Sequence, residues 1–220
     1  TDWITGFEAL VRWDHPERGR LTPAEFMLDA EKSGVIGELG AWTLRQACEQ
    51  AQLWPDQLRV SVNVSAAQLA GEIVTQVSDA LRATGLDSDR LEIEVAETSI
   101  VSDTDAARSA LSGLARLGVR IVLDQFGSEW AALSLLSRLP FSKVKIDRAL
   151  VADSECTSDS AAMVSAVCSF ARSWRVEVAA VGVETRTSAT RSHRVMSRSW
   201  PTAETIGVAE AATARQNSGI

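Results

Sequence analysis

The sequence predicts an α/β domain whose parallel strands close into a barrel. Strand-like segments rich in β-branched residues alternate with helix-like segments, as in a parallel sheet with helical crossovers. The number of strand-like segments, several of them with polar residues on one face, favours a closed barrel over an open sheet. An open doubly wound sheet would need a glycine-rich phosphate-binding turn after its first strand, and this sequence has none.

The elements of the first half follow from periodicity and capping signals. Residues 4–13 are predicted to form a strand, and a helix begins just after it. Thr22 suits the N-cap of that helix, Pro23 its first turn and Glu25 the reciprocal capping position. The further elements predicted here are a helix at 42–52, a strand at 59–65, a helix at 66–84 and a strand at 91–96.

The second half continues the alternation and then loses it. The predicted elements are a helix at 103–117, a strand at 119–126, a short helix at 131–138, a strand at 143–146, a helix at 160–174 and a strand at 176–181. Residues 186–220 are dominated by Arg, Ser, Thr and Ala without sustained periodicity. The sequence therefore predicts a domain at 1–185 and a divergent, poorly ordered tail at 186–220, in which 203–215 could form a weak helix.

Composition limits the class of protein. The 220 residues are 45% hydrophobic and 23% charged, enough for a sizeable core. A net charge of −7 argues against DNA as a partner, but it permits an anionic ligand if metal ions lie between that ligand and clustered carboxylates. The longest apolar run is too short to span a bilayer, and three cysteines without metal-ligand spacing point to a reducing cytoplasm.

Polar side chains interrupt strands that would otherwise face a barrel interior with aliphatic residues. Each of them would be costly to bury without a partner. The strand ends of a parallel α/β barrel converge on one rim, where functional sites form. Three carboxylates and an amide from four successive strands match the oxygen ligands that Mg²⁺, Mn²⁺ or Ca²⁺ prefers. These four residues are Glu8, Asn63, Glu94 and Asp124.

A structural interpretation of the same residues stays open. The acidic side chains could instead form a ring of salt bridges, with Glu8 or Glu94 paired to Arg12 or Lys145. Lys143, two residues before Lys145, is expected either to face solvent or to be a charge at a strand end.

A series of motifs connects these residues. Residues 8–13 read Glu-Ala-Leu-Val-Arg-Trp, and the later motifs follow in order: Leu-Thr-Pro-Ala-Glu-Phe at 21–26, Val-Asn-Val-Ser at 62–65, Glu-Val-Ala-Glu-Thr at 94–98, Leu-Asp-Gln-Phe-Gly at 123–127, Lys-Ile-Asp-Arg at 145–148 and Gly-Val-Glu-Thr at 182–185. In order and spacing this series resembles the EAL domain family of cyclic di-GMP phosphodiesterases. The resemblance covers residues 4–185 and implies a TIM-barrel-like (β/α)8 fold with one antiparallel strand.

The resemblance also implies an activity and a role for each residue. Family members hydrolyse cyclic di-GMP to linear pGpG with two divalent ions, usually Mg²⁺ or Mn²⁺. By motif, Glu8, Asn63, Glu94 and Asp124 correspond to ligands of the first ion, and Leu10 and Arg12 to residues that touch the dinucleotide. Lys145 corresponds to the lysine that orients the attacking water, Asp147 lies beside it, and Glu97 braces the loop after Asp124.

Two departures from the family pattern fall on the chemistry. Gln125 stands where the family has an aspartate that binds the second metal, and Val181 where it has a glutamate assigned as general base or metal ligand. A general base typically contributes about 10²–10⁴-fold in rate. The family's first strand and its last strand and helices have no counterpart, so the barrel is expected to be incomplete at both ends.

The sequence therefore favours a domain that binds cyclic di-GMP through a divalent metal site, with hydrolysis weak or lost. Two alternatives stay open: an active metal-dependent phosphodiesterase, and a non-functional fragment or protein-interaction module. Whether the chain is an enzyme is thus undecided at this point. Family habit adds a homodimer or a regulatory domain as partners.

Overall fold

A curled parallel sheet forms the centre of the protein in the computed structural model, which describes residues 4–101, 104–127, 138–154, 158–181, 204–205 and 210–211. The strands of this sheet are β1 (Gly6–Ala9), β4 (Arg59–Val64), β5 (Leu91–Ala96), β6 (Arg120–Phe126), β7 (Lys143–Ile146), β8 (Glu177–Ala180), β9 (Glu204–Thr205) and β10 (Glu210–Ala211). Their order across the sheet is β10-β1-β4-β5-β6-β7-β8-β9.

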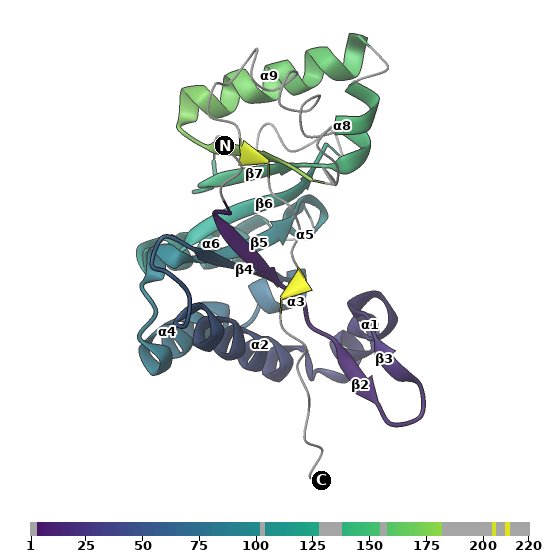
Figure 1. The fold of residues 1–220 in the computed structure, drawn as a ribbon, viewed down its shortest axis with the longest axis vertical. Coiled ribbons are helices and arrows are strands. Elements are labelled where there is room, and N and C mark those ends of the chain that lie inside the picture. Colours follow the sequence, from purple (N-terminus) through teal and green to yellow (C-terminus); the bar gives the residue numbers. More distant parts are fainter. Residues whose placement is uncertain are drawn as a thin grey trace.

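Helices flank this sheet, and a small hairpin with one helix projects from it (Figure 1). The helices are α1 (Pro23–Ser33), α2 (Ile36–Ala51), α3 (Ala66–Leu69), α4 (Ile73–Thr84), α5 (Glu97–Val101), α6 (Thr104–Arg116), α8 (Arg148–Ser154) and α9 (Ser158–Trp174), with one 3₁₀ turn, η1 (Ser88–Arg90). The antiparallel hairpin consists of β2 (Trp13–His15) and β3 (Gly19–Leu21).

The predicted α/β class is confirmed, and the fold is a partial TIM-barrel-like one. Every strand pairing that the structure describes in the main sheet is parallel, so the antiparallel strand implied by the resemblance is not among them. The sheet is also open within the described residues, because no pairing there joins β9 to β10. The described part of the chain is thus an incomplete barrel, in agreement with the expectation from the sequence.

The two faces of the sheet differ sharply in chemistry. Along β5, Leu91, Ile93 and Val95 are fully buried and belong to the hydrophobic core with residues of the flanking helices. Glu92 and Glu94 alternate with them and therefore point to the opposite, inner face. The sequence alternation thus places a dry core between sheet and helices and leaves charged side chains inside the curl.

Most predicted elements are present, with shifted ends. The chain leaves the sheet after Ala9, so the strand expected at 4–13 is only four residues long and is followed by the hairpin. The helix expected at 66–84 is two helices, because Ser65 and Gln68 cap the short α3 and the chain turns at Ala70–Glu72 before α4. The capping at Thr22 is confirmed: Glu25 Oε2 accepts a hydrogen bond from the Thr22 backbone N–H at 2.8 Å.

Several predictions lie wholly or largely outside the described residues. They include the short helix at 131–138, the motif at 182–185 and most of the tail at 186–220. Within that tail the two short strands β9 and β10 were not predicted from the sequence. Of the helices that the structure describes, none is both long enough and apolar enough to cross a membrane.

Candidate functional site

The predicted metal-ligand residues come from four strands that are neighbours in the sheet. Glu8 lies on β1, Asn63 on β4, Glu94 on β5 and Asp124 on β6, and Lys145 follows on β7. Asn63 is the direct register partner of Glu94, so these two residues share a row and a face. Parallel pairing of successive strands therefore brings the five side chains to one region of the inner face.

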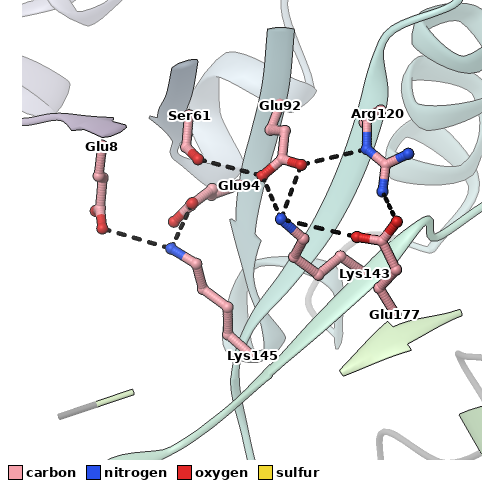
Figure 2. Close-up of polar contacts among 8 residues, drawn as sticks. All are labelled: Glu8, Ser61, Glu92, Glu94, Arg120, Lys143, Lys145 and Glu177. Atoms are coloured by element: carbon pink, nitrogen blue, oxygen red, sulfur yellow. Dashed lines mark hydrogen bonds and ion pairs between the residues drawn. The ribbon is translucent and has the colours of Figure 1, made fainter. Parts of the chain in front are cut away.

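Lys145 makes the main ion pairs of this group. Its Nζ lies 3.4 Å from Glu8 Oε2 and also forms an ion pair with Glu94 Oε1, as Figure 2 shows. Asn63 Nδ2 donates a hydrogen bond to Glu8 Oε1 at 2.7 Å. The salt-bridge arrangement considered from the sequence is thus present for Lys145 with both Glu8 and Glu94.

Burial strongly affects the charges of this group. Glu94 is 1% exposed and Lys145 5% exposed. Burial raises the pKa of Glu94 to about 7; the Lys145 ammonium opposes the rise and the Glu8 carboxylate adds to it. Burial alone would lower the pKa of Lys145, but the carboxylates of Glu94 and Glu8 outweigh it and raise that pKa above its ordinary value. Burial also raises the pKa of Asp124, with the Lys145 ammonium opposing it.

The carboxylate and amide oxygens of this group are ligands that suit a hard cation. Their arrangement, however, is centred on the Lys145 ammonium. The carboxyl oxygens of Glu94 accept no hydrogen bond from the described residues apart from their ion pair with Lys145. Three acidic side chains thus face one lysine, which leaves an excess of negative charge when all are ionised. Among the residues that the structure describes, no three acidic, histidine or cysteine side chains are yet close enough to hold a metal ion as they stand.

Glu97 and Asp147 lie beside this group and support its loops. Glu97 is fully buried at the start of α5, and its Oε2 accepts a hydrogen bond from the backbone N–H of Gly127 at 3.2 Å. Asp147 precedes α8, where its Oδ1 accepts from the Ala149 N–H at 2.8 Å. Its carboxylate is close enough to Asp124 to contribute to the raised pKa of that residue.

Leu10 and Arg12 lie where the chain leaves β1. Leu10 and Asn63 both line an open, mainly apolar cavity of about 120 Å³ between the end of β1 and the helices α1 and α2. Arg12 is half-buried, and its Nη1 donates a hydrogen bond to the Val11 carbonyl at 2.9 Å. The cavity therefore extends to Asn63, which neighbours the acidic side chains of the inner face.

Gln125 and Val181, which are expected from the sequence to depart from the family pattern, both lie among the described residues. Gln125 is exposed and has a φ of 56°. Residues other than Gly, Asn and Asp rarely adopt this left-handed backbone conformation. Val181 is half-buried directly after β8, and its backbone N–H donates to the Ile146 carbonyl at 3.1 Å. Gln125 thus directly follows Asp124, and Val181 is hydrogen-bonded to the residue that follows Lys145 on β7.

A second charged group on the inner face was missed from the sequence. Lys143 is 3% exposed, and its Nζ lies 2.8 Å and 2.9 Å from the two carboxyl oxygens of Glu92 (Figure 2). Lys143 is the first residue of β7, which agrees with a charge at a strand end, but the alternative that it faces solvent is wrong. The signal was present, since glutamates two apart on β5 and lysines two apart on β7 each place both charges on one face.

Comparisons with known proteins identify what the chain as a whole is similar to. The family model described as "EAL domain" matches residues 1–195. The bifunctional diguanylate cyclase/cyclic di-GMP phosphodiesterase MucR of Pseudomonas aeruginosa is 40% identical over 187 residues, 83% of this chain and 27% of its own length. The chain spans about a quarter of the length of the curated relatives that it matches, 22%, 23% and 27% for three of them.

Solved structures with the same fold are similar over most of the chain. The complex of the MucR phosphodiesterase with c-di-GMP superposes with a TM-score of 0.79 at 39% identity, covering 87% of this chain and 79% of that one. The calcium/cy-diGMP complex of BlrP1 from Klebsiella pneumoniae has a TM-score of 0.73 at 28% identity, covering 87% and 48%.

Proposed function

The chain belongs to the EAL domain family, and from this we propose that it binds cyclic di-GMP through one divalent cation and hydrolyses it weakly or not at all. The observation that carries the proposal is the convergence of Glu8, Asn63 and Glu94 on the inner face, with Asp124 close enough to contribute to the raised pKa of Glu94. MucR, at 39% identity, is a phosphodiesterase whose structure contains c-di-GMP, and this relationship supports the ligand class.

The cation would be held by Glu8, Asn63, Glu94 and Asp124. The oxygen-only donor set and the excess of carboxylates over the one ammonium support Mg²⁺ or Mn²⁺ there. A bound divalent cation supplies neutralisation of phosphate charge and acidification of water. For the cation to approach Glu8 and Glu94, the Lys145 ammonium has to give up part of its contact with them, which leaves it available to a water or a phosphate oxygen.

The other predicted residues receive supporting roles in this proposal. Leu10 would contact the dinucleotide from the cavity that it lines, and Arg12 would contact it from the adjoining segment. The hydrogen bond from Gly127 to Glu97 supports the idea that Glu97 braces the turn after Asp124. Asp147 would hold the start of α8 beside Lys145, as its hydrogen bond to the Ala149 N–H suggests.

Weak hydrolysis follows from Gln125 and Val181. An uncharged amide is a poorer ligand for a hard dication than a carboxylate, and a valine can neither bind a cation nor accept a proton. The second metal ion and the general base implied by the family pattern therefore lack their usual side chains at these two positions.

The test measures binding and turnover in the same sample. The chain is mixed with cyclic di-GMP and Mn²⁺, bound ligand is measured by calorimetry, and linear pGpG is followed by chromatography at high protein excess. We expect saturable binding that depends on the cation, with little or no product. Absence of binding with the cation present would overturn the proposal in favour of a fragment or protein-interaction module.

An active phosphodiesterase is the second candidate, and one observation favours it. Relatives that are 40% and 35% identical are named cyclic di-GMP phosphodiesterases, MucR and PdeR of Escherichia coli. In the same assay, rapid formation of linear product by the wild-type chain would establish this alternative.

The setting of the domain completes the proposal. We place it in the cytoplasm, which suits the two buried free thiols of Cys48 and Cys168. Because the chain spans only about a quarter of several relatives, a regulatory domain or a homodimer would be its further partners. The net charge of −7 gives no support for DNA as a partner.

A further inference from the structure

Two layers of charge occupy the inner face of the sheet, and they differ in balance. In the second layer Lys143 and Arg120 face Glu92 and Glu177, and the Arg59 guanidinium adds positive charge near Glu92, so this layer has no negative excess (Figure 2). In the first layer the single ammonium of Lys145 faces several carboxylates. The negative excess that would attract a divalent cation is thus confined to the first layer.

Strand register does not by itself produce this separation. Glu94 pairs with Val122 on β6, and Val122 pairs with Lys143 on β7, so Glu94 and Lys143 belong to one row. Adjacent strands lie about 4.8 Å apart, which puts the two backbones about 10 Å apart, within the combined reach of a lysine and a glutamate side chain. Lys143 nevertheless extends to Glu92, which lies two residues before Glu94 on β5.

The contacts around Glu92 explain why Lys143 points there. Glu92 Oε1 and Oε2 are 2.8 Å and 2.9 Å from Lys143 Nζ, and Oε1 is also 3.2 Å from Arg120 Nε. Ser61 Oγ donates a longer hydrogen bond to Oε2 at 3.4 Å. Burial would raise the pKa of Glu92, but the Lys143 ammonium, together with the Arg120 and Arg59 guanidinium groups, outweighs it and keeps that pKa below its ordinary value. Glu92 is therefore a well-satisfied charged partner for Lys143.

We infer that Glu92 is a positioning residue for the cation site: it holds the Lys143 ammonium in the second layer and so keeps that charge away from Glu94. Without the Glu92 charge, Lys143 has a buried carboxylate in its own row, Glu94, to which it can turn. A second ammonium on Glu94 would then compete directly with a divalent cation. This inference rests on the proposed function only in that the competitor is a cation bound at Glu94.

Removal of the Glu92 charge tests the inference. We expect E92Q to lower the affinity for Mn²⁺, measured by titration with detection of free Mn²⁺ by electron paramagnetic resonance, by about ten-fold. The double variant E92Q/K143M removes the displaced ammonium as well and should return the affinity to within about three-fold of the wild type. A merely structural role would not give this rescue, because the double variant lacks the ion pair altogether.

E177Q is the matched control, since it makes the same chemical change in the same layer. Glu177 Oε2 is 4.0 Å from Lys143 Nζ, a much longer contact than those between Lys143 and Glu92, so Lys143 keeps its short contacts to Glu92 when Glu177 is changed. Its Mn²⁺ affinity should stay near that of the wild type. Equal affinities of E92Q and wild type would overturn the inference, as would a double variant as weak as E92Q.

A crystal structure of E92Q without metal provides a readout that does not depend on cation binding. We expect Lys143 Nζ to lie within hydrogen-bonding distance of Glu94 in that structure. A Lys143 that stays beside Gln at position 92 would overturn the inference even if the wild type binds no Mn²⁺. Failure of wild-type binding would by itself count against the proposed function alone, so the two claims are judged separately.

Discussion

Lys145 determines the electrostatics of the candidate site at the scale of single residues. Its ammonium group pairs with Glu8 and Glu94, which would otherwise be close, buried carboxylates with unfavourable mutual repulsion. Burial, with an added contribution from the Glu8 carboxylate, nevertheless holds the pKa of Glu94 at about 7 in spite of the pairing. At neutral pH the negative charge on Glu94 is therefore unfavourable in the folded protein, and a bound divalent cation would stabilise it.

This raised pKa predicts how stability depends on pH. Between pH 4.5 and about 7 the folded protein retains a proton on Glu94 that the unfolded chain releases, so the free energy of unfolding should fall as pH rises through this window. The contribution is on the order of 1–3 kcal/mol by pH 8. Urea unfolding at pH 5 and pH 8, compared between wild type and E94Q, measures it.

The comparison with E94Q isolates Glu94 from the other titrating groups. E94Q should lose less stability than the wild type between pH 5 and pH 8, and excess Mn²⁺ should restore much of the wild-type loss at pH 8. Parallel pH profiles for the two proteins would show that Glu94 does not titrate in this range.

Acidic substitutions at Gln125 and Val181 are expected to increase the hydrolytic activity. Q125D/V181E restores two carboxylates next to Asp124 and Lys145, and we expect the rate of cyclic di-GMP hydrolysis to rise by about 10²-fold or more. Q125N/V181Q is the matched control, because Asn and Asp both tolerate the left-handed backbone at position 125 while only Asp adds charge. Equal rates of linear product formation in both variants would contradict the proposed reason for weak activity.

At the scale of secondary-structure elements, two helices approach each other closely at a glycine, and the sequence alone does not reveal this contact. Gly113 is buried in α6, and a Cβ built there would lie 2.8 Å from Val74 Cγ2 of α4. Valine is stiff at χ1 and cannot easily move aside. The glycine thus permits α6 to approach α4 over the outer face of the sheet.

This packing predicts opposite results for two glycine substitutions in helices. G113A should lower the free energy of unfolding by about 1–3 kcal/mol through overpacking. G37A, at a position in α2 where a Cβ would meet only Gln76 Nε2 at 3.8 Å, should raise it slightly, by no more than about 1 kcal/mol. Chemical denaturation measures both, and a neutral G113A would contradict the claimed close approach.

The success of the sequence predictions also varied by element. The strands at 91–96 and 143–146 are found at their predicted ends, because alternating or β-branched residues are bounded there by clear breaks. The helix at 66–84 is divided because Ser65 and Gln68 close a capping box around a single turn, a local hydrogen-bond choice that periodicity does not show. The strand at 4–13 ends early because the hairpin β2–β3 competes for the chain.

The whole molecule separates apolar and charged residues between the two faces of its sheet. The outer face and the helices share a continuous core, whereas the inner face contains the two charged layers. The sequence predicted which acidic residues lie on the inner face, since alternation fixes the face of each side chain. The same alternation places Lys143 on the face of Lys145, but it does not identify the partner of Lys143, because Glu92 is 51 positions away in the sequence and only the sheet order brings them together.

The number of divalent cations bound by the whole chain is the most direct test of the central claim, that the inner-face carboxylates hold a single cation. We predict that equilibrium dialysis against Mn²⁺ finds one tight site per wild-type chain and that the site is lost in E8Q and in E94Q. A wild-type chain without a tight site, or variants that retain it unchanged, would contradict the account.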